Sequence, residues 1–223
     1  MRLIRLFSEP YEAFSELQNA SWVPAFVACM ALSLLSNLVV VNAIGVAVIM
    51  RRFQSDAGLK TGGSAVFAGL YAAQTGVMLI GLLTISIVMW VVLNLRRSSV
   101  PETGAETGAG YRIVFTICSY AAYARETVRL IITLVVVSWR HFSRVPLAYA
   151  GDIKTNAAAF LNVNTARPLF NLAKSLDALM FGFLALVAIG LWKTIPNLRL
   201  QRANEVVLLS WLIYVALAVT FGR

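Results

Sequence analysis

Residues 76–97 read GVMLIGLLTISIVMWVVLNLRR, which is twenty residues without a charged side chain followed by Arg96 and Arg97. About 20 predominantly apolar residues in α-helical form cross the hydrocarbon layer of a bilayer. Paired basic residues directly after such a run are typical of the point where a helix meets the lipid headgroups. The stretch predicts a transmembrane helix over about residues 70–95, and therefore a membrane protein.

The composition of the whole chain indicates the same environment. Of its 223 residues 59% are hydrophobic and 13% are charged, and the mean hydropathy is +0.76. A soluble domain is about 45–50% apolar and about 25% charged. The net charge of +9 comes from bases near the ends of apolar segments, where they meet anionic headgroups. We expect the lipid bilayer as a partner and no nucleic acid.

Four further apolar segments extend the prediction to an all-α, polytopic membrane helix bundle. They cover about residues 22–45, 113–139, 170–192 and 203–221. Charged residues interrupt the segment 113–139, but each half is too short to cross alone, so we expect one continuous helix there. Residues 22–223 are interpreted as a single transmembrane domain of about five helices. His141 is placed in the loop after the third span.

Residues 1–21 are interpreted as an amphipathic helical segment rather than a secretory signal, because no early apolar region follows the charged start. Ser8 can cap a helix whose first turn tolerates Pro10. Tyr11, Phe14 and Leu17 then share one face. We expect this helix to lie along the membrane surface. A frayed terminus is the alternative.

Charge alone does not orient the bundle. With five spans the termini lie on opposite sides, and eight basic residues fall on the N-terminal side against nine on the other. Arg51 and Arg52, directly after the first span, favour an external N-terminus under the positive-inside rule.

A cluster of charged residues inside the apolar segments is the main candidate site. It comprises Arg125, Glu126, Arg129 and Asp177. Each charge at the centre of a spanning helix costs about 2.5–3.5 kcal/mol on insertion scales, so such residues face the bundle interior and pair. Glu126 and Arg129 are three positions apart, a spacing that brings helical side chains together.

The depth of these residues predicts a pair between two helices. With its midpoint near residue 126, the third span places Arg129 about 4–5 Å toward its C-terminal end, at about 1.5 Å per residue. The fourth span returns with its midpoint near residue 181, which places Asp177 about 6 Å toward the same face. We predict that Asp177 pairs with Arg129 or Arg125, with the side chains within about 8 Å of each other.

Two interpretations of the cluster remain open. It is either a site for a substrate, a proton or a lipid headgroup, or a structural clasp that fixes helix register. Two arginines against two acids leave no spare charge, which suits a clasp better than an anion site.

Motifs for catalysis or cofactor binding are missing from the sequence. It contains no HExxH, no GxSxG with a downstream Asp and His, no phosphate-binding glycine loop and no CxxC pair. Cys29 and Cys118 lie in apolar segments and are expected to remain thiols. We therefore expect no enzyme activity, no catalytic residues, no cofactor and no metal site.

Several short stretches resemble a known family. They are the opening 6–14, LFSEPYEAF; 156–161, NAAAFL; 175–177, SLD; 188–191, AIGL; and 211–214, WLIY. Together they are similar to the bacterial members of the YIP (Ypt-interacting protein) family. The resemblance implies five spans, a cytoplasmic N-terminus and, for a bacterial chain, the inner membrane. The chain departs from the family at 120–126, YAAYARE, where a proline is usual.

The resemblance and the residues together favour a non-enzymatic adaptor, scaffold or membrane-organising factor, since eukaryotic YIP proteins are linked to Rab-type GTPases and vesicle traffic. Its expected partners are another membrane protein or further copies of the chain. Its expected partner surface comprises Glu9, Pro10, Tyr11, Glu12, Phe14 and Glu16. The alternative is a transporter, channel or lipid-moving protein that uses the polar site between the third and fourth spans.

Overall fold

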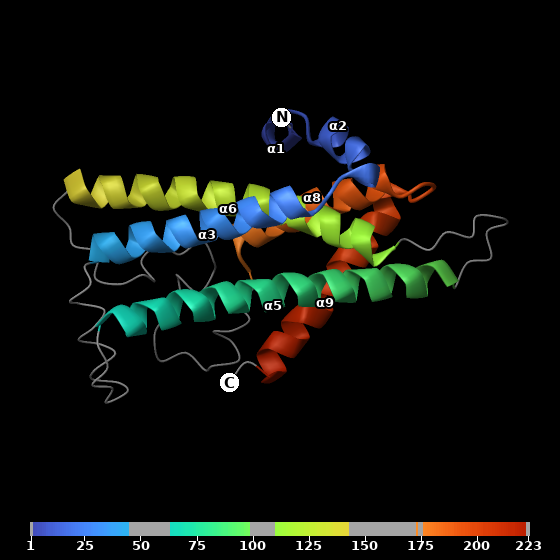
Figure 1. Ribbon diagram of the computed structural model, residues 1–223. Helices are drawn as coiled ribbons and strands as arrows, with labels where there is room; N and C mark the ends of the chain where they lie inside the picture. The colour runs from blue at the N-terminus through green and yellow to red at the C-terminus, as the bar shows by residue number, and fades with distance from the viewer. Residues whose placement is uncertain (1, 45–62, 99–109, 143–172, 174–175, 222–223) are drawn as a thin grey trace.

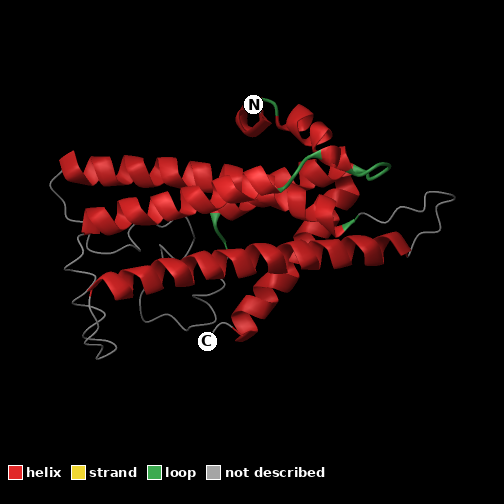
Figure 2. Ribbon diagram, viewed as in Figure 1, coloured by secondary structure: helices red, strands yellow, loops and turns green. Residues whose placement is uncertain are grey.

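The computed structural model describes residues 2–44, 63–98, 110–142, 173 and 176–221 as a helix bundle with short loops (Figure 2). Its regular elements, in chain order, are α1 Arg2–Ser8, α2 Pro10–Ser15, the 3₁₀ turn η1 Glu16–Asn19, α3 Val23–Ile44, α5 Gly63–Ser98, α6 Tyr111–Phe142, α8 Ala178–Thr194 and α9 Leu200–Phe221.

Three helices of the described chain are long and apolar enough to cross a membrane. The qualifying windows are Val23–Val40 in α3, Gly76–Leu95 in α5 and Leu200–Leu217 in α9. The helix α8 is also apolar but has only 17 residues. The helix α6 has 32 residues, with charged side chains in the middle of the segment. The chain is thus a helical bundle with three candidate spans, compatible with an integral membrane protein.

The helix α6 is the centre of the bundle. In Figure 1, α3 lies beside it and runs in the same direction, while α5 runs in the opposite direction. The helix α8 and the turn η1 also pack against α6. All nine residues from Val114 to Ala122 are buried, so this half of α6 is covered on every side.

Polar and apolar side chains are distributed as expected for a bundle in lipid. Large apolar residues such as Val27 on α3, Ile80 on α5 and Val135 on α6 are more than half exposed. Small hydroxyl side chains, including Ser33, Ser36, Ser119 and Ser210, are buried between helices. Small polar residues at helix contacts let backbones approach closely and form hydrogen bonds where lipid offers none.

The N-terminal segment packs against the bundle as part of its core. Phe14 is completely buried, and Leu6, Ala13 and Leu17 are nearly so. The Thr194 hydroxyl at the end of α8 donates a hydrogen bond to the Phe14 carbonyl over 3.0 Å. The apolar face that we expected to meet lipid therefore contacts α8 and α6 instead.

Gly190 on α8 makes this docking possible. A Cβ atom built on Gly190 would lie 2.9 Å from two ring carbons of Phe14 and would collide with the Ile117 side chain of α6. Only a glycine allows α2, α6 and α8 to meet at this point. The turn of α8 around Gly190 thus fixes the N-terminal segment.

An aromatic cluster joins the starts of α3 and α6 to the last third of α5. The Trp22 ring lies 5.2 Å from Phe115 and 5.5 Å from Phe26, centroid to centroid. Tyr111 stacks on Phe115 at 5.8 Å and lies edge-on to Trp90 at 6.2 Å. Contacts of this kind add about 0.5–1.5 kcal/mol each beyond buried area, so the cluster holds the three helices together.

Three local expectations were wrong. The fourth span was not expected to be interrupted, but α8 begins at Ala178 because Asp177 has extended backbone angles (φ −109°, ψ 127°) and caps the helix; of the expected stretch 170–175, only residue 173 is described. Ser8 does not cap α2: Glu9 precedes the helix, and the Ser8 hydroxyl donates to the Arg5 carbonyl. His141 lies within α6, which continues to Phe142. The stretch 156–161 lies outside the described residues.

Candidate functional site

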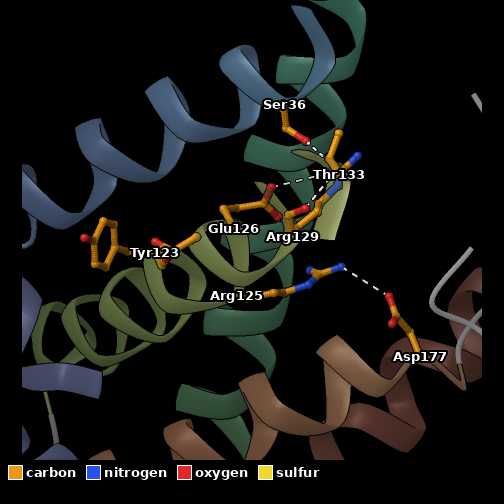
Figure 3. Close-up of polar contacts among 8 residues, drawn as sticks. Ser36, Tyr123, Arg125, Glu126, Arg129, Thr133 and Asp177 are labelled. Carbon is orange, nitrogen blue, oxygen red and sulfur yellow. Dashed lines mark hydrogen bonds and ion pairs between the residues drawn. The ribbon is translucent and has the colours of Figure 1, made fainter. Parts of the chain in front are cut away.

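The candidate site is a polar centre where α3, α6 and the start of α8 meet (Figure 3). The Arg125 guanidinium of α6 lies 3.8 Å from Asp177 Oδ2, measured from Nη2. The predicted ion pair between these two segments is present, and it forms through Arg125. Asp177 Oδ1 accepts a hydrogen bond from the Leu179 backbone N–H over 3.0 Å. One carboxylate therefore caps α8 and pairs with α6 at the same time.

A second ion pair lies within α6. Arg129 Nη1 lies 3.3 Å from Glu126 Oε2, at the expected spacing of three residues. The Glu126 side chain is only 4% exposed, whereas the Arg129 side chain is 36% exposed. Glu126 is thus the most deeply buried charge of the cluster, and its neutralisation depends on Arg129.

Hydroxyl groups extend the polar centre to α3. The Thr133 hydroxyl donates to the Arg129 carbonyl over 2.8 Å. A hydroxyl has one hydrogen, so Ser36 is the donor in the 3.3 Å contact between Ser36 Oγ and Thr133 Oγ1. This contact is a hydrogen bond between two buried residues 97 positions apart. It fixes the register of α3 against α6 at the level of the charges.

The charges of the cluster cancel. Two guanidinium groups face two carboxylates, each in a pair of its own. The Arg125 side chain is 33% exposed, and its buried Nε has no hydrogen-bond partner in the described part of the chain. The 3.8 Å separation from Asp177 is longer than a hydrogen bond. The arrangement suits electrostatic pairing of helices. No group of three metal-ligating side chains occurs in the ranges that the structure describes.

The expected partner surface is divided between the core and the exterior. Glu9 and Glu12 are exposed. Tyr11 is half exposed, with its ring edge-on to Trp192 at 6.1 Å, and Pro10 is intermediate. Glu16 forms an ion pair with Arg5 at 3.4 Å. Including Phe14 in this surface was wrong, because its ring is part of the core.

Sequence reasoning missed the hydroxyl pair and the glycine contact. Cys29, Ser33, Ser36 and Asn37 recur at helical spacing on α3, and all four are buried. That stripe of small and polar side chains was a readable signal for a polar helix contact. Gly190 gave no comparable signal, because a glycine in an apolar helix does not indicate which residue will pack against it.

Comparison with known proteins gives no match, whether to a family model, to a curated protein or to a solved structure.

Proposed function

We propose that the chain is a non-enzymatic integral membrane protein that acts as an adaptor, scaffold or membrane-organising factor. The observation that carries this proposal is the docked N-terminal segment. Phe14 anchors it in the core, while Glu9 and Glu12 on the same segment are exposed. A rigid platform with outward carboxylates suits recognition of a basic protein surface. Carboxylates are repelled by anionic headgroups, which favours a protein over lipid as the partner.

The proposal includes five spans in a bacterial inner membrane, with the N-terminus in the cytoplasm. The YIP resemblance supplies this topology. The two ion pairs support this topology, because pairing lowers the cost of placing the charged side chains of α6 in lipid. The aromatic cluster around Trp22 and Tyr111 supports an interface at the starts of α3 and α6, because Trp and Tyr gather at the headgroup level. The helix α8 has 17 residues and spans about 26 Å at about 1.5 Å per residue, close to the hydrocarbon thickness of about 30 Å.

The acidic platform predicts a charge-dependent partner. Reversing both exposed carboxylates, Glu9→Lys with Glu12→Lys, should abolish association with a basic partner and leave the fold intact, because both side chains are exposed. Quantitative mass spectrometry of proteins cross-linked to tagged chain in native membranes measures this. Glu205→Lys, a reversal at an exposed position of α9, is the control. A protein captured by wild type and control but lost from the double variant supports the proposal. Identical capture by all three contradicts it.

A transporter, channel or lipid-moving protein is the second candidate, favoured by Arg125. Its side chain is one-third exposed, with an unpartnered buried Nε in the described chain. It also faces the start of α8, and helix ends inside a bundle are where transporters bind substrates. On this reading Arg125 and Asp177 line a water-filled route.

Thiol labelling separates the two candidates. Leu176, 40% exposed and next to Asp177, is replaced by cysteine in a Cys29→Ala, Cys118→Ala background in nanodiscs. Under the leading proposal Leu176→Cys should not react with a membrane-impermeant maleimide, because a thiol in lipid does not form the reactive thiolate. Gln201→Cys, at an exposed position near the start of α9, should react. Equal labelling of both sites would favour the second candidate.

A further inference from the structure

The turn between α8 and α9 contains a cavity of about 430 Å³. Trp192, Asn197, Leu198, Arg199 and Arg202 line it. Its volume lies within the range of about 300–1,000 Å³ that small-molecule sites occupy. It is separate from the polar centre of α6, since none of its lining residues belongs to that cluster.

The lining is strongly basic. It contains two arginines, and both residues are exposed. Lys193 adds a third positive charge beside the cavity, with its Nζ 4.0 Å from the centre of the Trp192 ring. The first turn of α9 contains no acidic residue, so the positive end of the helix dipole adds to the positive charge of the same region. The electrostatic field in the cavity therefore favours an anion.

The backbone of the turn holds this lining in place. Asn197 has a positive φ of 61°, a left-handed conformation that asparagine tolerates better than most residues. The turn directs the chain from α8 into α9 within a few residues, and Ile195 and Leu198 are buried beneath it. Trp192, near the end of α8, and Arg199, directly before α9, thus lie on either side of a tight, anchored turn between two apolar helices. When two such helices cross a bilayer, their turn lies at the headgroup level.

We propose that this cavity binds a phosphate-bearing anion, with the headgroup phosphate of an anionic phospholipid as its source in the membrane. One arginine guanidinium group can donate two parallel hydrogen bonds to two phosphate oxygens. Basic pockets beside spanning helices recognise lipid headgroups. The Trp192 ring supplies the apolar wall that a glycerol backbone contacts. The inference rests on the proposed placement of α8 and α9 in a bilayer.

Calorimetric titration of the detergent-purified chain tests the site with two probes: dioctanoyl phosphatidylglycerol and inorganic phosphate. Arg199→Glu should weaken lipid binding at least about tenfold, because it replaces a cation of the cavity by an anion. Arg112→Glu is the matched control, since Arg112 is also an exposed arginine but lies at the start of α6 and does not line the cavity. Size-exclusion chromatography monitors whether each variant folds. If Arg199→Glu does not fold, Arg199→Gln replaces it, because it removes the positive charge without adding a negative one.

Each outcome of the titration has a defined meaning. Lipid binding that Arg199→Glu removes and Arg112→Glu retains, without binding of inorganic phosphate, establishes a headgroup site. Equal affinity for both probes, again lost only in Arg199→Glu, establishes the anion site with soluble phosphate as the source. Failure of wild type to bind either probe overturns the proposal, as does equal weakening by the two variants. Failure of the chain to enter nanodiscs would instead overturn the membrane placement.

Discussion

Replacing Gly190 by leucine should destabilise the bundle by about 3 kcal/mol, the upper end of the cost of adding methylenes to a filled core. The first added carbon already meets Ile117 and the Phe14 ring. Phe14 cannot move away easily, because it is completely buried and its carbonyl accepts the Thr194 hydrogen bond. Thermal unfolding in detergent, followed by fluorescence-detected size exclusion, measures the loss. Proteolysis near residue 20 should accelerate, because the N-terminal segment undocks.

Gly182 provides the matched control in the same helix. A Cβ at Gly182 meets nothing within 4 Å, and the residue is exposed. Gly182→Leu should leave stability unchanged or raise it by up to about 1 kcal/mol, since leucine is the better helix former. If Gly190→Leu unfolds at the same temperature as Gly182→Leu, the close contact of α2, α6 and α8 does not exist.

Replacing Arg129 by methionine should cost about 3–5 kcal/mol, the usual cost of removing one partner from a buried ion pair. The reason is Glu126, whose side chain is 96% enclosed and would lose its counterion. Restoring neutrality with Glu126→Gln in the same chain should recover most of the lost stability. Unfolding of the two single variants and the double variant in detergent gives the coupling energy of the pair.

The chain offers an exposed pair of the same chemistry as a control. Arg5 and Glu16 lie 3.4 Å apart, with side chains 52% and 41% exposed. Arg5→Met should cost less than about 1 kcal/mol, because water solvates the remaining carboxylate. Equal effects of Arg129→Met and Arg5→Met would mean that Glu126 is solvated, and the clasp interpretation would be wrong.

The helices and the ion pairs follow from local pattern and depth. Uncharged runs of about 20 residues are long enough to define helices by themselves, and α3 begins within one residue of the expected start at 22. The Arg125–Asp177 pair was predictable because an unpaired charge is costly in lipid and because antiparallel spans relate sequence position to depth. The structure places these side chains 3.8 Å apart, inside the expected limit.

The wrong expectations share a physical cause. An amphipathic helix shows which face is apolar, but its sequence does not say whether lipid or protein covers that face, and the apolar face around Phe14 turned out to meet protein. Asp177 was placed inside a helix because its neighbours are apolar, although aspartate is also a common N-cap. The sequence therefore indicated which charged residues form ion pairs, but not the hydroxyl contact of Ser36 and Thr133 beside them.

The two ion pairs also differ in when they can form during synthesis. Glu126 and Arg129 are three positions apart and are synthesised almost together, whereas Asp177 is synthesised 52 positions after Arg125. At about 5–20 residues per second the counterion of Arg125 arrives roughly 3–10 s later. If α6 crosses the bilayer as proposed, the Arg125 charge therefore stays unpaired in lipid until Asp177 is synthesised, at a cost of about 2.5–3.5 kcal/mol. A chain truncated before Asp177 would leave α6, the central helix of the bundle, with Arg125 lacking its counterion.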